Sequence, residues 1–304
     1  MAASQMVTQR DVVKEPQFVV EGTTVALYGT TPVNPAFTAF GQNASLVKSA
    51  DPTTAEKRIS GNVDRQEKTK TREKNEVTVK FLMLTGDETE LAWAQNLPDG
   101  SAGTPDESRT LFWSYNDDAV APVETFEQFL GCKPNNSTLT INNEGYITLE
   151  ITCSVKTITI DTVGPTIGIG SFATANTGTP LIHNDGGAAP FVYNSVAYEQ
   201  KGFSISVALT EAIQDPSGTL TDLYRRPTQR VITGSIDLFK KSDVFDLDAR
   251  AVTPQTATLT VDTGQIVGTF TRFIFLPSGE EISGDTSDAT IETKTFEADV
   301  LSWA

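Results

Sequence analysis

Residues 138–152 read Thr-Leu-Thr-Ile-Asn-Asn-Glu-Gly-Tyr-Ile-Thr-Leu-Glu-Ile-Thr. Small polar residues alternate with Leu and Ile on both sides of an Asn-Asn-Glu-Gly turn, which is the pattern of a β-hairpin with one buried face. The pattern predicts two antiparallel strands with Ile141 opposite Tyr146. In that register Cys132 lies near Val155, a diagonal neighbour of Cys153.

Cys132 and Cys153 are the two cysteines of the chain. The predicted register makes a disulfide between them geometrically conceivable. The alternative, which we favour, is a pair of reduced thiols in a protein made in a cytosol. Two cysteines and a single histidine, His183, are too few for a disulfide scaffold or a Cys-based zinc site. We therefore expect no metal and no cofactor.

Similar alternation recurs along the whole chain, separated by clusters of Gly, Pro, Asn and Asp. Helix patterns are few and short, and acidic first turns predict helices at residues 87–97 and 242–250. We predict a mainly β fold of β-sandwich or barrel domains with one or two short flanking helices. The other clear alternating runs are residues 76–82, 145–155, 203–210 and 266–276.

The composition narrows the possible functions. The 304 residues suggest one large or two ordinary domains. The 23 basic and 39 acidic residues give a net charge of −16, which repels nucleic acid phosphates and anionic lipids. No apolar run approaches the roughly 20 residues of a membrane helix, and the N-terminus lacks the apolar core of a signal peptide. We expect no membrane contact and assembly in the cytoplasm.

Two short motifs each occur twice along the chain, in the same order. Residues 58–64 match 231–237 as Ile-Ser/Thr-Gly-x-Val/Ile-Asp, and residues 134–142 match 254–262 as Pro-x-x-x-Thr-Leu-Thr-Ile/Val-Asn/Asp. Two ordered matches favour a duplicated β domain. The first match aligns Ile59, Gly61 and Val63 with Ile232, Gly234 and Ile236, and the apolar members of both sets are expected on the core face.

The duplication predicts a domain organisation. An N-terminal arm (1–15) precedes a first domain over residues 16–163, and a linker over 164–184 leads to a second domain over 185–304. The linker is expected there because the segment 164–190 is long, lacks a clear strand or helix pattern and is rich in small residues.

A charged segment, about residues 51–76, interrupts the first copy. Hydrophobic residues nearly vanish between Asp64 and Glu76, and acidic residues are interleaved with basic ones. Because aromatic residues are also absent, a DNA-binding patch is a weak interpretation. We interpret the segment as an extended polar hairpin, with one strand after Gly61 and a return strand into 77–82, that meets acidic surface of a neighbouring subunit. The residues assigned to this contact are Arg65, Lys68, Lys70, Arg72 and Lys74.

Candidate catalytic residues are isolated. His183 is followed by Asp185, which can orient a base, but no nucleophile motif accompanies it. Asp117 follows an aromatic run containing Trp113 and Tyr115, the kind of cluster that a glycosidase uses, and a solvated turn explains it equally well. No phosphate-binding glycine motif or calcium-loop spacing is present. We expect no enzymatic activity.

Several runs resemble the tail tube (major tail) proteins of long-tailed viruses. These runs are Pro190-Phe-Val-Tyr-Asn, Phe203-Ser-Ile-Ser-Val-Ala-Leu, the segment from Arg226 to Phe239, and the segment from Phe129 to Glu150. The resemblance implies tube domains whose sheets join around a ring, rings that stack into a hollow tube, and a hairpin that reaches the next ring. It implies hexameric rings for one domain per chain and a trimer, acting as a pseudo-hexamer, for two.

The same resemblance implies the partners. They are further copies of the chain and other tail proteins such as the tape measure and terminator proteins, and DNA passes through the lumen without tight binding. A polar, negatively charged lumen agrees with this role because it repels phosphate. Two rival interpretations stay open: a β-sandwich adhesin or carbohydrate-binding protein that uses Trp113 and Tyr115, and a β-rich glycosidase that uses Asp117.

Overall fold

The computed structural model confirms the predicted mainly β class, because its elements are antiparallel strands with one short helix over the residues that it describes. The described residues are 12–22, 26–33, 35–57, 67–95, 107–116, 124–142, 144–161, 172–174, 176–183, 191–214, 224–239, 245, 248, 250, 254–262, 266–276 and 291–303.

The elements fall into two groups along the chain. The first comprises β1 (Val12–Gly22), β2 (Thr38–Ala39), β3 (Gln42–Lys57), β4 (Glu67–Leu82), α1 (Glu88–Gln95), β5 (Ser108–Asn116), β6 (Glu124–Ile141), β7 (Ile147–Val155) and β8 (Thr157–Asp161). The second comprises β9 (Phe191–Tyr193), β10 (Val196–Tyr198), β11 (Gln200–Gln214), β12 (Tyr224–Phe239), β13 (Gln255–Asp262), β14 (Ile266–Phe275), β15 (Ile291–Ala298) and β16 (Val300–Trp303).

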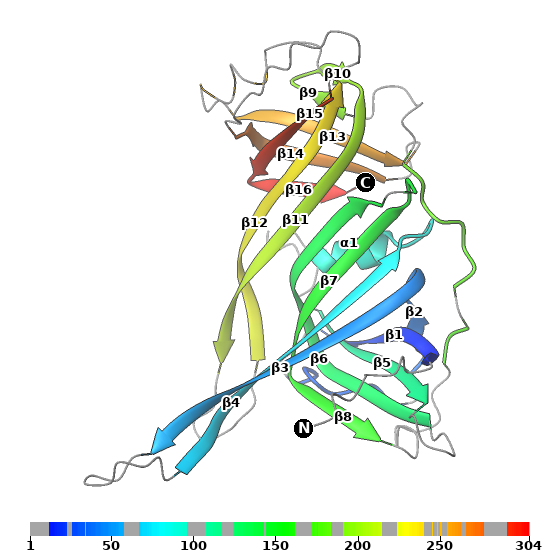
Figure 1. Ribbon diagram of the computed structural model, residues 1–304, viewed down its shortest axis with the longest axis vertical. Coiled ribbons are helices and arrows are strands. Elements are labelled where there is room, and N and C mark those ends of the chain that lie inside the picture. The colour runs from blue at the N-terminus through cyan, green and yellow to red at the C-terminus, as the bar shows by residue number, and fades with distance from the viewer. Residues whose placement is uncertain are drawn as a thin grey trace, which may run out of the picture.

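A central antiparallel sheet runs through the middle of the molecule in the order β3-β4-β7-β6-β11-β12-β15 (Figure 1). Successive side chains of each strand point to opposite faces, so the alternating sequence produces one apolar face. Phe81, Leu149, Leu139 and Ile205 stand side by side on neighbouring strands of that face, and all are buried. Strands β1, β5 and β8 lie across one end of this sheet, and β13, β14 and β16 lie across the other (Figure 1).

The second group of strands repeats the pairing of the first. In the first group β1 pairs with β2 and β5, β6 with β5, β7 and β8, and β4 with β3 and β7. In the second group β9 pairs with β10 and β13, β14 with β13, β15 and β16, and β12 with β11 and β15. The residues at 245, 248 and 250 are helical and follow β12 as α1 follows β4. Residues 12–161 and 191–303 are therefore two units of the same topology, joined where β6 pairs with β11.

The two units also agree in strand register. The hairpins β3–β4 and β11–β12 align at a constant offset of 157 residues, and each contains a bulge that skips one residue, Thr71 in the first and Thr228 in the second. A further bulge recurs between β5 and β6 and between β13 and β14. There the equivalent residues Gly131 and Arg272 both adopt left-handed backbone conformations, with φ of 68° and 54°.

The motif matches found in the sequence do not coincide with these equivalences. Residues 134–142 run along β6, whereas residues 254–262 run along β13, the counterpart of β5. In the hairpin register Ile236 corresponds to Val79 and not to Val63. Ile59, Gly61 and Val63 lie outside the described residues. Thr, Val and Ile recur in any half-buried strand, so short matches can align strands that hold different places in the sheet.

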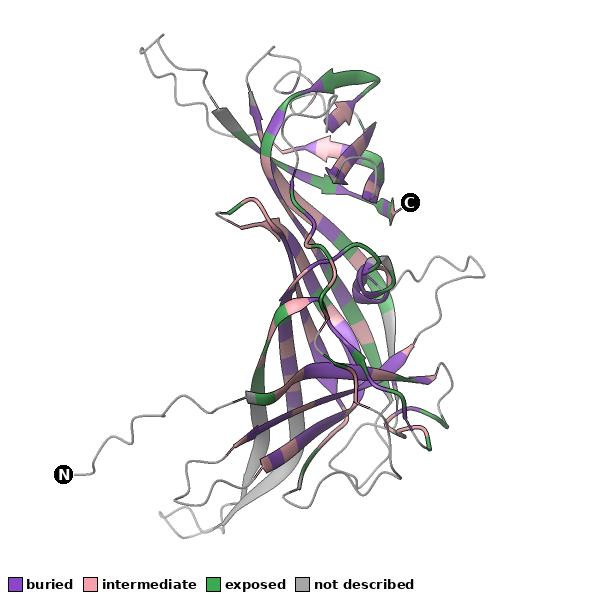
Figure 2. Ribbon diagram, turned by 90° about the vertical axis from the view of Figure 1, so that its right-hand side faces the viewer, coloured by how far each residue is buried: buried purple, intermediate pink, exposed green. Residues whose placement is uncertain are grey.

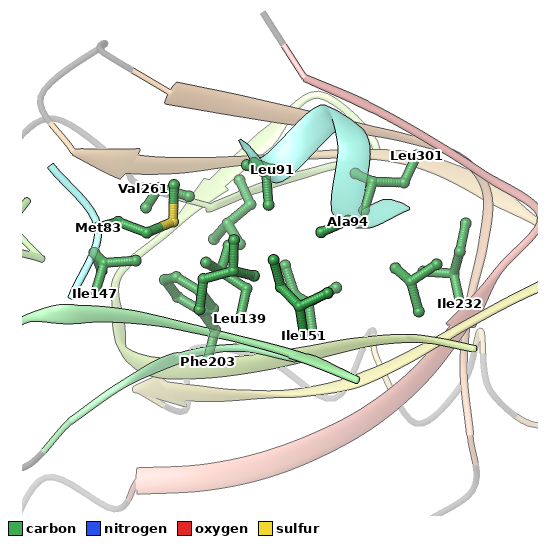
Figure 3. Close-up of a cluster of buried hydrophobic side chains, with 14 of the residues drawn as sticks. Met83, Leu91, Ala94, Leu139, Ile147, Ile151, Phe203, Ile232, Val261 and Leu301 are labelled. Carbon is green, nitrogen blue, oxygen red and sulfur yellow. The ribbon is translucent and has the colours of Figure 1, made fainter. Parts of the chain in front are cut away.

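Both units contribute to one core. Leu91 and Ala94 of α1 lie over the apolar face of the central sheet, close to Ile151 of β7 and Ile232 of β12 (Figure 3). Leu301 of β16 closes the cluster on the side of the second unit. Buried residues accordingly continue from one unit into the other through the middle of the molecule (Figure 2).

The hairpin that opened the sequence analysis forms, with its register shifted by one residue. Ile141 pairs with Ile147 rather than with Tyr146. The turn is longer than predicted because the Asn142 side-chain oxygen accepts hydrogen bonds from the backbone N–H groups of Glu144 and Tyr146, both at 2.9 Å. Cys132 and Cys153 are both buried and unpaired as free thiols.

The predicted linker is packed against the first unit wherever it is described. Phe172 stacks on Phe112 with ring centroids 4.8 Å apart. Pro180 forms a β-bridge with Leu84, and the side chain of Leu181 is buried. The described part of the predicted linker is therefore anchored to the first unit through Phe172, Pro180 and Leu181, whereas Thr174, Thr177, Thr179 and Ile182 are exposed.

Candidate assembly surfaces

Small hydroxyl residues cover the face of the central sheet that lies opposite the core. Strand register places them in rows across neighbouring strands, for example Thr138, Ser206 and Thr233 on β6, β11 and β12. We call the whole set the hydroxyl face: Ser45, Val47, Thr78, Lys80, Asn136, Thr138, Thr140, Glu150, Thr152, Ser204, Ser206, Ala208, Val231, Thr233, Ser235, Asp237, Thr293, Thr295 and Glu297.

The charge on the hydroxyl face is sparse and mostly negative. Lys80 is its single cation and lies 3.8 Å from the carboxylate of Glu150. Asp237 accepts a 2.6 Å hydrogen bond from the Thr293 hydroxyl. Glu297 is an exposed carboxylate on β15. A surface of this kind offers phosphate groups no cluster of cations.

Strand β3 forms one edge of the central sheet. Among the described residues it pairs with β4 alone, whereas its counterpart β11 pairs with both β12 and β6. Val47 on β3 is 66% exposed. An extended edge of unpaired backbone groups is a template for pairing with another strand.

A buried carboxylate anchors this edge strand to the body of the first unit. Glu127 on β6 is fully buried and accepts hydrogen bonds from the ammonium of Lys48 on β3, from Trp113 Nε1 at 2.8 Å and from the Tyr115 hydroxyl at 2.9 Å. Burial alone would raise the pKa of Glu127. The bonds from Lys48, Trp113 and Tyr115 outweigh that effect and hold the pKa below its ordinary value.

The second hairpin, β11–β12, meets the first unit through a buried polar cluster, which we call the internal joint. Lys133 of β6 donates a 2.6 Å hydrogen bond to the backbone carbonyl of Arg225, and the Ser154 hydroxyl of β7 donates one of 2.9 Å to Glu211. The guanidinium of Arg225 lies 3.1 Å from the same carboxylate. Burial raises the pKa of Glu211 even though Arg225 opposes the shift. Each charged group of the joint thus has a partner, as buried charges require.

The predicted contact arm forms a hairpin, but its outward strand was misplaced. That strand is β3, which ends at Lys57, before Gly61, and the hairpin extends beyond the body of the molecule (Figure 1). Lys68, Lys70, Arg72 and Lys74 lie on β4, and Arg65 lies outside the described residues. A projecting hairpin satisfies its backbone through its own two strands, so it needs no apolar core face to remain extended.

The duplicated motif is placed only in its second copy. Ile232 and Ile236 lie on β12 and are buried on the core face. Gly234 stands between them, where a Cβ atom would come within 2.5 Å of the Phe296 ring and 2.4 Å of the Ser204 carbonyl oxygen. The glycine is therefore required by the aromatic ring that covers it.

The candidate catalytic groups are not assembled in the described part of the chain. His183 is buried edge-on to the Phe203 ring, with centroids 5.8 Å apart, while Asp117 and Asp185 lie outside the described residues. Tyr115, which the carbohydrate-binding interpretation takes as exposed, is buried, and Trp113 is half-buried. The polar groups of both rings are used by Glu127. Within the described residues no group of three or more His, Cys, Asp or Glu side chains is placed to hold a metal ion.

Glu127, the internal joint and Glu297 were not singled out in the sequence. A signal for the hydroxyl face was present, since Ser and Thr occupy many of the alternate positions of the long strands. No comparable signal marks the joint, because its groups come from four strands that are distant in sequence.

Comparison with known proteins gives only remote similarities. No family model matches the chain, and no curated protein matches it significantly. A chain of the anti-feeding prophage (AFP) baseplate matches with a TM-score of 0.35 and 14% identity, over 54% of this chain and 100% of that one. A chain of the PVC sheath-tube complex, an extracellular contractile injection system in its extended state, matches with a TM-score of 0.32 and 14% identity, over 53% and 99%. Similarity of this strength does not assign a function. No helix in the described residues has the length and apolarity to cross a membrane.

Proposed function

We propose that this chain is a structural subunit of a viral tail tube, which assembles into closed rings that stack into a hollow conduit for DNA. The observation that carries the proposal is the unequal environment of two equivalent strands. β11 is paired on both sides within the chain, whereas β3 has one unpaired side among the residues that the structure describes. A second copy that supplies the missing neighbour repeats the β6–β11 pairing between chains and removes the open edge.

The repeat sets the size of the ring. Each chain holds two units of one topology, so three chains supply the six equivalent positions that six single-unit chains would occupy. The hydroxyl face of every unit then lies on one continuous surface. We assign this surface to the lumen because its one lysine is paired and its other charges are carboxylates.

The remaining features of the proposal follow from the resemblance of the sequence to tail tube proteins. The β3–β4 arm passes a neighbouring subunit of its own ring, and its outer part contacts the adjacent ring. Tape measure and terminator proteins are the expected partners. The assembled chain belongs to the virion tail after assembly in the host cytoplasm. The proposal assigns no active site to the chain.

Electron microscopy of the purified protein and of the native particle tests this function. We expect rings of three chains and stacked tubes with a central channel. Discrete monomers that bind glycans would instead favour the adhesin, and glycoside turnover lost on Asp117→Asn would favour the glycosidase.

A proline in the open edge tests the pairing itself. Pro52 is already tolerated in β3, and an edge strand accommodates proline only where the N–H would face away from its neighbour. Ala50 lies two residues before Pro52, so its N–H points the same way. We expect Ala50→Pro to leave a folded subunit that forms no rings, while Ala50→Val assembles normally. Normal tubes from Ala50→Pro would contradict pairing through β3.

A further inference from the structure

We propose that Glu297 on β15 is the docking point for the β3–β4 hairpin of a second copy of this chain. The inference rests on the proposed function and specifies which groups join neighbouring subunits within a ring. Glu297 is exposed, pairs with Thr233 across β15 and β12, and belongs to the hydroxyl face.

The internal joint is the template for this contact. In the internal joint the hairpin β11–β12 supplies a cation, Arg225, and a carboxylate, Glu211. The strand on which the hairpin is seated, β7, supplies a hydroxyl group, Ser154, and we call β7 the receiving strand. The side chains of Arg225 and Glu211 are 3% and 9% exposed, so the hairpin is seated firmly on the first unit.

Strand register identifies the residues of β3–β4 and of β15 that are equivalent to the residues of the internal joint. In the hairpin, the offset of 157 residues takes Glu211 to Thr54 and Arg225 to Lys68. On the receiving side, Glu76 faces Ser154 on β7 as Thr233 faces Glu297 on β15. Because Glu76 and Thr233 are related by the same offset, Ser154 and Glu297 are equivalent.

The same three chemical groups occur at both joints, with two of them exchanged. In the internal joint the carboxylate is on the hairpin and the hydroxyl is on the receiving strand. In the joint between copies the hydroxyl residue, Thr54, is on the hairpin and the carboxylate, Glu297, is on the receiving strand. The cation stays on the hairpin, as Lys68 instead of Arg225. Both sets therefore allow a hydroxyl–carboxylate hydrogen bond beside a positive charge.

One charged group of the internal joint has no counterpart in the proposed joint between copies. Lys133, which binds the Arg225 carbonyl in the internal joint, corresponds to Ile274 on β14. The joint between copies thus lacks one buried charged hydrogen bond. It is expected to separate more readily than the internal joint, as a contact that forms only during assembly must.

Site-directed crosslinking tests the proposed contact. A Thr54→Cys, Glu297→Cys variant, treated with a short thiol-specific crosslinker under assembly conditions, should give covalent dimers and trimers and no larger species from single rings. Ser154→Cys with Glu211→Cys is the positive control and should link only within one chain. The matched control is Thr54→Cys with Thr295→Cys, because Thr295 lies two residues before Glu297 on the same face of β15. We expect its yield of crosslinked dimer to be at least several-fold lower than that of the Thr54→Cys, Glu297→Cys variant. The native Cys132 and Cys153 are buried, so the unaltered protein sets the background.

Charge reversal gives a second measurement that does not depend on cysteines. Glu297→Lys should reduce the assembled fraction at least tenfold in low salt, and Lys68→Glu added to Glu297→Lys should restore most of it. Circular dichroism of each variant verifies folding. Tubes from the unaltered protein, combined with no crosslink at 54 and 297 and no effect of Glu297→Lys, would overturn the docking point and leave the tube function intact. Failure of the unaltered protein to form rings or tubes would overturn both.

Discussion

At the scale of the residue, the fold depends on polar groups that are buried together with their partners. Glu127 holds the edge strand β3 through Lys48 while also binding Trp113 and Tyr115. A carboxylate in such a place stabilises the fold only while it is ionised, because its three partners are all donors. The stability of the β3 edge should therefore depend on pH.

The lowered pKa of Glu127 fixes the direction of that dependence. An acid whose folded pKa lies below its unfolded value contributes stability that is fully present above the unfolded pKa, near 4.5, and is lost as pH falls through the folded pKa. We expect Glu127→Gln to cost about 1–3 kcal/mol at neutral pH and to weaken the acid dependence of unfolding. Denaturant titrations between pH 3 and 7 measure both effects. Glu150→Gln, a partly exposed control, should change stability by less than about 1 kcal/mol.

Ile236 provides a test of the two faces of β12. It is fully buried, so Ile236→Asp replaces apolar packing by a carboxylate in the core, opposite the buried Lys294 of β15, and should destabilise the protein by more than about 3 kcal/mol. Val231 lies on the opposite face of the same strand and is 43% exposed. Val231→Asp should cost only about 0.5 kcal/mol. Equal unfolding free energies for the two variants would contradict the assignment of the faces.

At the scale of the element, the two long hairpins show how one structure serves two roles. They share register and bulge, yet β11–β12 is seated on the first unit whereas β3–β4 extends beyond the body (Figure 1). Their second strands are both basic, with Arg225, Arg226 and Arg230 on β12 and Lys68, Lys70, Arg72 and Lys74 on β4. On a chain of net charge −16, such strands are suited to meet acidic neighbours.

Removal of the arm charges tests this role. We expect replacement of Arg65, Lys68, Lys70, Arg72 and Lys74 by Ser to leave a folded, soluble subunit that no longer makes long tubes. The effect should resemble that of high salt on the unaltered protein, because screening weakens the same contacts. Tube lengths are measured by electron microscopy. An unchanged length distribution would exclude an electrostatic role for the arm.

At the scale of the whole molecule, the fold separates three surfaces with different chemistry. The core face of the central sheet is mainly apolar, the hydroxyl face is polar with few cations, and the outer side of β3 is unpaired among the described residues. In the proposed ring, the hydroxyl faces would enclose a channel that DNA passes without electrostatic trapping. At 0.15 M salt the Debye length is about 8 Å, so only charges close to the duplex matter.

Added lysines test the lumen assignment. Thr138, Ser206 and Thr233 lie in one row of the hydroxyl face. We expect tubes of the unaltered protein to retain no duplex DNA at low salt, and tubes of the Thr138→Lys, Ser206→Lys, Thr233→Lys variant to bind it with strong salt dependence. Filter retention across a salt series measures the difference. Tight, salt-dependent binding by the unaltered tube wall would exclude the proposed conduit surface.

The sequence by itself determined the class of the fold and the two faces of its strands, because alternation is a local property with a period of two residues. It could not determine which strands correspond between the units. The matching runs of Thr, Val and Ile in β6 and β13 suggested the wrong equivalence. Only the pairing register shows that β13 of the second unit is the counterpart of β5 in the first. The internal joint likewise required the tertiary structure. Ser154 and Glu211 meet because β6 pairs with β11, a contact between distant parts of the chain that no local pattern specifies.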